Sequence, residues 1–276
     1  MKLTIATPRR HAHRPSFTLV EMLVVIVIIG ILATLLTVAA AGAMAKAKVT
    51  RIKTELDNIA GSFKAYKTKY GSYPPNFGVD IALVQQHLRK AFPRILATEL
   101  TNTNLTNLNT NTEAQTKAIY FWLSGFSADV TRPRTGPGGP FSSTPGASEP
   151  LYDFDKSRLL PAAASLPYTA ATLPTYTASG MSMPYVYFDT SRPYATAPTN
   201  DPTYNAVIRP YRRVVGAANE YMEPQGFQVL SAGIDNDWRG TTALNSQPMF
   251  PAGPFTGAHA DNLGNFTQQM FSEATP

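Results

Sequence analysis

The feature that most constrains this chain is an unbroken run of 24 residues without a charged side chain, at positions 22–45. As an α-helix, which rises 1.5 Å per residue, the run would be about 36 Å long, and the hydrocarbon core of a bilayer is about 30 Å thick. The run therefore predicts a helix that crosses a membrane. A secretory signal peptide is the alternative: Ala43 and Ala45 have the small-x-small spacing of a cleavage site, but the apolar region of such peptides is shorter, about 7–15 residues.

Charge is unevenly distributed along the 276 residues, which include 24 Lys and Arg and 18 Asp and Glu. Four of the cations precede the apolar run, in a segment without an acidic residue: Lys2, Arg9, Arg10 and Arg14. From residue 17 onward the 20 basic and 18 acidic side chains nearly cancel. A nucleic-acid-binding protein normally carries a basic stripe on its folded part, so we expect no nucleic-acid partner. Cysteine is absent, which excludes disulfides, thiolate zinc sites and cysteine nucleophiles.

Glu21 lies at the start of the apolar segment. A carboxylate within a membrane-spanning helix is costly, and such a residue usually has a charged or polar partner. A glutamate at the level of the lipid headgroups is the alternative, and periodicity alone does not choose between the two.

Residues 16–21 have the sequence SFTLVE, with the short basic leader before them and the apolar run after them. This combination resembles the prepilin cleavage and methylation motif of type IV pilins and type II secretion pseudopilins. The resemblance implies that a prepilin peptidase cuts between Ser16 and Phe17 on the cytoplasmic side and that the new N-terminus is methylated. Ser16 stands where the family usually has Gly. The mature chain would comprise 260 residues and would retain Glu21 as its fifth.

The same resemblance implies an assembly role for Glu21. Cleavage would leave a cationic amine on Phe17, which could pair with the Glu21 carboxylate of a neighbouring subunit in the apolar core of a filament. An unpaired charge is costly at low dielectric, so this pair would set the register between subunits.

Beyond the apolar run, hydrophobic residues continue at helical spacing: Ile52, Leu56, Ile59, Phe63, Tyr66 and Tyr70. The pattern predicts one helix over residues 17–70, ended by Gly71 and by the prolines that follow it. The opposite face carries nine charged residues: Lys46, Lys48, Arg51, Lys53, Glu55, Asp57, Lys64, Lys67 and Lys69. We expect this face to be solvated, with a lipid or nucleic-acid patch as the alternative.

Residues 74–276 are expected to form a globular head. Helices are predicted over residues 81–94 and within 113–126, and strands over 185–188, 206–208 and 227–230. The Asn/Thr-rich segment 98–116 and the Pro/Gly-rich segment 131–150 are expected to be loops. Strands that follow helices indicate an α+β fold with a small antiparallel sheet packed on the long helix and with loop-rich insertions. The chain thus divides into a cleaved leader (1–16), a transmembrane or filament-core helix (17–45), an amphipathic second half of that helix (46–73) and a periplasmic head (74–276).

Oxygen-rich segments near the C-terminus form the candidate metal site. Asp235 and Asp237 follow a predicted strand, and Asp261 and Asn262 lie about 25 residues later. Calcium takes six to eight oxygen ligands, which such loops supply, but for the first segment taken alone a plain Asx turn is the favoured interpretation. Both segments resemble the C-terminal loops of major pseudopilins. That resemblance implies that Asp235, Asp237, Asp261 and Asn262 bind one calcium ion between them.

No sequence pattern supports catalysis. The chain has no GxSxG, GxxxxGK[ST] or HExxH motif, and neither His87 nor His259 has an acid or a nucleophile beside it in sequence. We therefore expect a non-enzymatic protein.

The resemblance implies a structural filament subunit of a type II secretion system or a type IV pilus-like machine. Such a subunit is first a single-pass inner-membrane protein with its head in the periplasm, and it then joins a periplasmic or cell-surface filament. Its expected partners are further copies of itself, the prepilin peptidase and the inner-membrane secretion platform. A membrane-anchored periplasmic binding module and a membrane-tethered hydrolase are the alternatives.

Overall fold

The structure is a computed structural model that describes residues 18–78, 80–111, 113–161, 166–192, 199–201, 206–216, 218–238 and 249–274. The chain divides into two compact units, one ending at Lys46 and one beginning at Ala47. Helix α1 (Leu19–Tyr70) is continuous through this division. Each unit is described by itself below.

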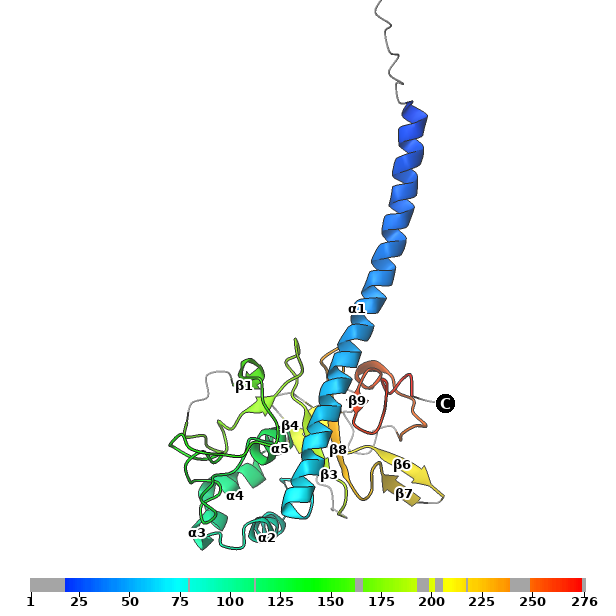
Figure 1. The fold of residues 1–276 in the computed structure, drawn as a ribbon. Helices are drawn as coiled ribbons and strands as arrows, with labels where there is room; N and C mark the ends of the chain where they lie inside the picture. Colours follow the sequence, from blue (N-terminus) through cyan, green and yellow to red (C-terminus); the bar gives the residue numbers. More distant parts are fainter. Residues whose placement is uncertain are drawn as a thin grey trace, which may run out of the picture. The chain divides into compact units, whose positions relative to one another are not determined.

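Helix α1 has 52 residues and ends where the sequence predicts (Figure 1). Gly71 adopts a positive φ of 81° and donates its amide hydrogen to the carbonyl of Lys67 at 2.7 Å, which is the usual left-handed cap of a helix C-terminus. The predicted apolar stripe is confirmed, because its first five members are buried: Ile52, Leu56, Ile59, Phe63 and Tyr66. Tyr70, the last member, is half-buried against Phe92 and Phe126.

The rest of the chain forms short helices and small antiparallel sheets. The helices are α2 (Ile81–Ala91), α3 (Ala97–Leu100), α4 (Thr103–Thr110) and α5 (Ala114–Leu123), with 3-10 turns η1 (Lys156–Arg158) and η2 (Gly257–His259). The strands are β1 (Leu159–Leu160), β2 (Thr175–Tyr176), β3 (Val186–Asp189), β4 (Thr199–Asp201), β5 (Ala206–Ile208), β6 (Arg212–Val215), β7 (Ala218–Tyr221), β8 (Phe227–Ser231) and β9 (Leu263–Gly264). The predicted α+β class is therefore confirmed, and β3, β5 and β8 occupy the three predicted strand positions.

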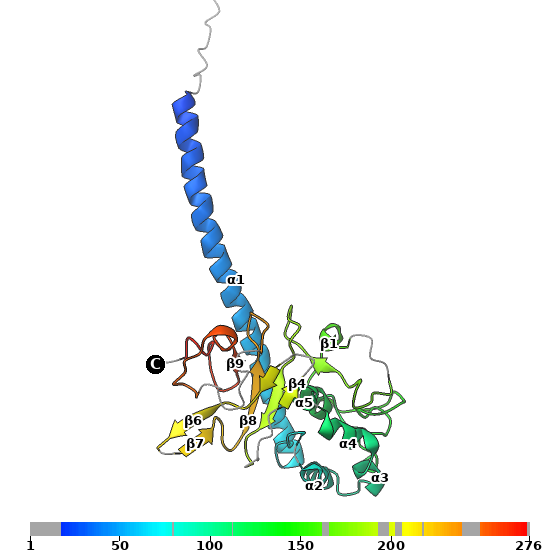
Figure 2. The same cartoon turned by 180° about the vertical axis from the view of Figure 1, so that it is seen from behind.

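The central sheet has the order β3-β8-β9, and all its neighbours are antiparallel. Both cartoon views place β3 and β8 alongside the C-terminal half of α1 (Figures 1 and 2). Phe63 of α1 makes the contact, because its ring stacks on Tyr187 of β3 at 4.2 Å and lies 5.4 Å from Phe227 of β8. Pairs β1-β2, β4-β5 and β6-β7 form three further two-stranded sheets.

The prediction of a loop over residues 98–116 is wrong. Helices α3 and α4 occupy much of this segment, and α5 begins at Ala114. Asn102 caps α4 by accepting the amide hydrogen of Asn104 at 2.8 Å, and Leu105 and Leu108, one turn apart, are fully buried. Two leucines thus override a composition that favours loops.

The expectation that the charged face of α1 is solvated is wrong at Lys53 and Glu55, which are both buried. Lys53 pairs with Asp57 at 2.7 Å and reaches the carbonyls of Gly264 and Asn265, close to β9. Both side chains therefore connect α1 to the head instead of facing water.

Glu55 is the centre of a polar cluster between α1 and the head. Its carboxylate accepts hydrogen bonds from Tyr185 at 2.7 Å, from Tyr176 at 2.9 Å and from Tyr152 at 3.2 Å. Arg158 donates from both terminal nitrogens of its guanidinium, one of them at 2.8 Å. Burial, with the charge of Glu55 next, raises the pKa of Tyr185 well above its usual range, so this phenol stays protonated and donates. We call these five residues the Glu55 cluster.

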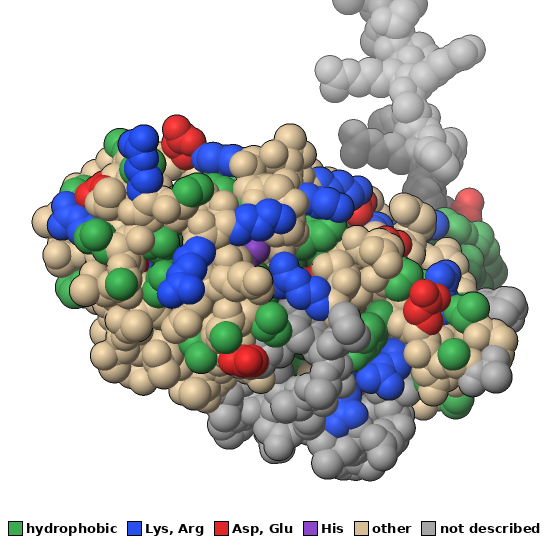
Figure 3. Space-filling view, turned by 90° about the horizontal axis from the view of Figure 1, so that it is seen from below, with side chains coloured by type: hydrophobic (Ala, Val, Ile, Leu, Met, Phe, Trp, Pro, Cys, Tyr) green, Lys and Arg blue, Asp and Glu red, His purple; other side chains and the backbone are tan. Residues whose placement is uncertain are grey.

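Exposed cations gather where α1 and α2 end. Lys67 and Lys69 lie in the last turn of α1, and Arg89 and Lys90 lie in the last turn of α2. On the face seen in Figure 3, Lys and Arg clearly outnumber Asp and Glu. Cations are favoured at helix C-termini, where the helix dipole presents its negative end, so helix stabilisation accounts for their position.

We expect Glu55→Gln to lower the free energy of unfolding by about 2 kcal/mol, because Arg158 would lose its buried carboxylate partner and keep only the exposed Asp155, 3.4 Å away. Denaturant unfolding of the full chain in detergent, followed by tryptophan fluorescence, measures this. The matched control is Glu149→Gln, which removes an exposed carboxylate paired with Lys69 and should cost less than about 1 kcal/mol. Equal losses in the two variants would contradict a special role for the cluster.

Candidate functional sites

The predicted cleavage residues Ser16 and Phe17 lie outside the described residues. The description begins at Thr18, directly before α1. Thr18 Oγ1 accepts the backbone N–H of Glu21 at 3.2 Å, and Glu21 Oε2 accepts from the backbone N–H of Thr18 at 3.3 Å and from its hydroxyl at 3.2 Å. This reciprocal pattern is a capping box, which satisfies two of the free amide groups at a helix N-terminus. In the single chain, Glu21 therefore caps α1.

The first half of α1 is long and apolar enough to cross a membrane. Its most apolar 18-residue window has a mean hydropathy of 3.0, and among the described residues no part of that window is buried. Large side chains are exposed all round this half, including Ile26, Leu35 and Val38. Helices that are apolar on every side are stable only in lipid or inside an assembly.

The structure brings together Asp235 and Asp261, two of the four predicted metal ligands. Asp261 Oδ2 accepts the backbone amides of Ile234 at 2.6 Å and of Asp235 at 2.7 Å. Gly233 makes this approach possible, because its φ is 72° and a Cβ there would collide with the backbone of Asp261. The loop after β8 is thus held against the segment before β9.

Two observations suit a cation with oxygen ligands beside these carboxylates. The second oxygen of Asp261, Oδ1, is buried and has no hydrogen-bond partner among the described residues. Burial, followed by the charge of Asp261, raises the pKa of Asp235 to about 6. A bound cation would satisfy the free oxygen and would reverse the pKa shift by stabilising both carboxylates. Within the described parts of the chain, however, no group of three or more His, Asp or Glu side chains is placed to hold a metal ion.

The remaining two predicted ligands have other contacts. Asp237 donates its backbone amide to Asp235 Oδ1 at 2.9 Å, so the Asx turn considered for this sequence is formed. The side-chain nitrogen of Asn262, Nδ2, lies 3.2 Å from the hydroxyl of Tyr211 and 3.3 Å from Nδ1 of His259. The side chain of Asn262 thus belongs to a buried cluster with these two residues.

Asn236 is a structural residue that the sequence did not single out. It has a positive φ of 58°, which asparagine tolerates better than most residues. Its Oδ1 accepts the amides of Ser182 at 2.9 Å and Met183 at 2.7 Å, and its Nδ2 donates to the Ser182 hydroxyl at 2.6 Å. An asparagine at a turn position after a strand could have indicated this role, but the sequence does not show which distant residues its side chain contacts.

Residues 14–37 match the family model of the prokaryotic N-terminal methylation motif. This segment contains the predicted cleavage site, the capping box and the start of the apolar helix. Searches of curated proteins and of solved structures each returned no match. The chain therefore carries a pilin-like N-terminus, with prepilin-type processing residues and a long apolar helix.

The raised pKa of Asp235 predicts how pH affects the metal-free protein. The folded state holds the proton up to about pH 6, whereas an unfolded Asp loses it near pH 4. The stabilisation from this group is therefore complete below about pH 4 and is lost as the pH rises to about 6. In the presence of a chelator, we compare the melting temperatures of wild type and Asp235→Asn. The melting temperature of wild type, relative to that of the variant, should decrease as the pH rises from 4 to 7. Asparagine is a matched replacement because it keeps the Asx acceptor. Parallel plots of melting temperature against pH for the two proteins would contradict the raised pKa of Asp235.

Proposed function

We propose that the chain is a non-enzymatic structural subunit of a type IV pilin-like filament, and more narrowly a pseudopilin of a type II secretion system. The methylation motif at the start of a 52-residue helix with an apolar first half is the observation that carries this proposal. The subunit is stored in the inner membrane as a single-pass protein with its head in the periplasm. Its partners are the prepilin peptidase, the secretion platform and other copies of the chain.

Glu21 supports polymerisation in particular. It is the only charged residue between Phe17 and Ala45, and in the single chain it is exposed and bonds only to Thr18 among the residues described. Removal of the leader would place a cationic amine on Phe17, one residue before the capping box. In a filament, this amine and the Glu21 carboxylate of a neighbour would neutralise each other where water is excluded.

The Glu55 cluster supports a mechanical role for the head. A filament subunit must keep its head attached to the helix while the helix is drawn out of the membrane. Glu55 joins α1 to three tyrosines and one arginine of the head through hydrogen bonds. Phe63, about two turns further along α1, adds aromatic stacking. Charge-assisted hydrogen bonds inside a protein are stronger than neutral ones, so they resist separation of helix and head.

Calcium is a second part of the proposal. Asp235 and Asp261 would supply carboxylate oxygens, and the free Oδ1 of Asp261 supports such a ligand. The ion would join the loop after β8 to the segment before β9 and so stabilise the C-terminal part of the head. This loop arrangement, which resembles that of major pseudopilins, is also what favours type II secretion over a pilus.

Processing and polymerisation are tested in one experiment. We expect the chain produced with a prepilin peptidase to begin at N-methylated Phe17, as measured by intact mass and N-terminal sequencing. With an assembly platform also present, it should appear in sedimentable filaments. A first residue of Met1, or one beyond Ala45, would contradict prepilin processing.

Three variants separate the charge of Glu21 from its capping role. Glu21→Gln can still close the capping box but has no charge, Glu21→Ala has neither, and Thr18→Ala keeps only the charge. We expect both Glu21 variants to insert into the membrane and fold but to lose the sedimentable polymer. Thr18→Ala should retain the polymer, at a cost of about 1 kcal/mol in helix stability. Normal filaments from Glu21→Gln would refute the proposed pairing.

Calcium is tested by thermal melting of the full chain in detergent. At a hundredfold excess over Kd the ion should stabilise the head by about 2.7 kcal/mol, or roughly 5–10 °C in melting temperature. We expect a chelator to remove this increment and Asp235→Ala to remove it with calcium present. Asp80→Asn, which keeps its helix-capping acceptor, is the control and should respond to calcium as wild type does. If the chelator leaves the melting temperature unchanged, a plain Asx turn without bound calcium is the better explanation of this loop.

A further inference from the structure

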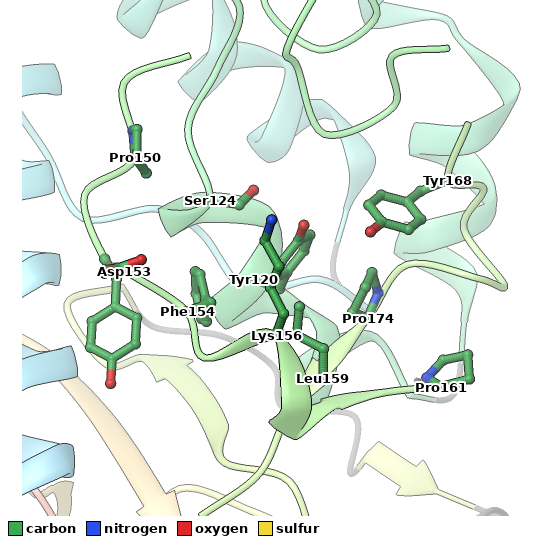
Figure 4. A pocket seen from close by; sticks show the side chains of 11 residues that line it. Tyr120, Ser124, Pro150, Asp153, Phe154, Lys156, Leu159, Pro161, Tyr168 and Pro174 are labelled. Carbon is green, nitrogen blue, oxygen red and sulfur yellow. The ribbon is translucent and has the colours of Figure 1, made fainter. Parts of the chain in front are cut away.

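A cavity of about 360 Å³ lies in the head beside α5 (Figure 4). One of its lining residues, Tyr152, also donates a hydrogen bond to Glu55 of α1. Tyr120 of α5 and Ser124, the residue that follows this helix, form one wall. Residues 150–161 form a second wall and residues 168–174 the third. This volume is within the range of sites that hold small ligands.

Four half-buried aromatic side chains line the cavity: Tyr120, Tyr152, Phe154 and Tyr168. They contact one another edge to face or tilted, with Tyr120 and Phe154 5.1 Å apart, Tyr120 and Tyr168 5.9 Å apart, and Tyr152 and Phe154 4.8 Å apart. Because the rings brace each other, they form a preorganised apolar surface, and their partial exposure leaves part of it open to a ligand.

Polar groups of three kinds share this cavity. Ser124 Oγ is buried and has no hydrogen-bond partner among the described residues, and Figure 4 shows it on the cavity lining together with Lys156. The hydroxyls of Tyr120 and Tyr168 are the second kind, and burial raises the pKa of Tyr120, so its phenol stays protonated and can donate. Asp153 and Lys156 are both exposed on the lining, and within the described residues neither forms an ion pair.

We propose that this cavity binds a short neutral saccharide. Sugar rings present C–H faces, which pack on aromatic rings, and hydroxyls, which each donate and accept. The lining matches both properties, since Asp153 only accepts, Lys156 only donates, and the serine and tyrosine hydroxyls do either. The charges of Asp153 and Lys156 cancel, which favours a neutral ligand over an ionic one.

A proline-rich peptide is the competing ligand, because such segments also bind on tyrosine and proline surfaces. A polyproline II helix offers only acceptors and extends about 3.1 Å per residue, so it needs donors along an extended groove. The lining of this cavity includes the acceptor Asp153, which is in no ion pair among the described residues and which a polyproline II helix cannot satisfy, so the saccharide fits better. The inference does not depend on the proposed filament function.

Saturation-transfer NMR and calorimetry on the full chain test the proposal, in a detergent such as lauryldimethylamine oxide that has no sugar headgroup. The probes are maltose, cellobiose, lactose and N,N′-diacetylchitobiose, with decaproline as the competing ligand. We expect saturable binding of at least one disaccharide and none of decaproline. The proposal is overturned if none of the four disaccharides binds at 20 mM, a Kd that corresponds to about 2 kcal/mol of standard binding free energy. Displacement of a bound sugar by decaproline would also overturn it.

Variants then locate the site. Asp153→Asn and Lys156→Gln should each weaken binding about tenfold, since each loses a charge-assisted hydrogen bond. Tyr168→Ala should weaken it about three- to tenfold, and Tyr168→Phe should recover the part that comes from the ring. Tyr221→Phe, on the β6-β7 hairpin, is the control and should bind as wild type does. Melting curves confirm that each variant is folded, and unchanged affinity in folded Asp153→Asn and Lys156→Gln would refute this location.

Discussion

The arrangement of this protein depends on one buried carboxylate. Glu55 lies on the side of α1 that faces the head, and it accepts hydrogen bonds from Arg158 and from three tyrosines that are distant in sequence. Its partners come from the segments around η1, β2 and β3, so a single side chain fixes three parts of the head on the helix. A buried ion pair is not by itself a large source of stability, but loss of its other partners would leave the Glu55 carboxylate desolvated and uncompensated, which is costly.

Apolar packing extends this attachment along α1. Phe63 stacks against β3 and β8, and Tyr66 bonds to the buried His87 at 2.9 Å, which connects α1 with α2. Burial, with Arg192 and Lys90 next, lowers the pKa of His87 to about 3, so it is neutral at physiological pH and serves as a structural residue. The head is thus assembled around the C-terminal half of a helix whose N-terminal half has no apolar partner among the residues described.

Residues in the N-terminal and C-terminal parts of the chain have separate roles. At the N-terminus, Glu21 has a local role as a capping residue and, in our proposal, a second role in the filament. At the C-terminus, Asp261 connects the loop after β8 to the segment before β9 through two backbone amides. The aromatic cavity beside α5 is lined by neither set of residues, which leaves its surface available for a function of its own.

Features that depend on local pattern can be predicted from the order of residues alone. An uncharged run of 24 residues predicts a spanning helix, the stripe from Ile52 to Tyr66 predicts its buried face, and residues 16–21 indicate processing. These follow from helical period and residue type, which neighbours in the chain define. The three principal strands and the α+β class were predicted on the same basis.

Which polar residues are buried, and which partners they have, depends instead on the folded arrangement. Lys53 and Glu55 have the same local setting as the solvated lysines of α1, and only distant tyrosines, an arginine and backbone carbonyls make their burial favourable. Helix α4 was missed because two buried leucines outweigh its Asn/Thr-rich composition. Likewise, the sequence indicated Asp235 and Asp261 as a pair, but the fold gave the Asn262 side chain different partners. In each case the deciding energy comes from desolvation and long-range hydrogen bonds, which depend on three-dimensional neighbours and not on the order of residues.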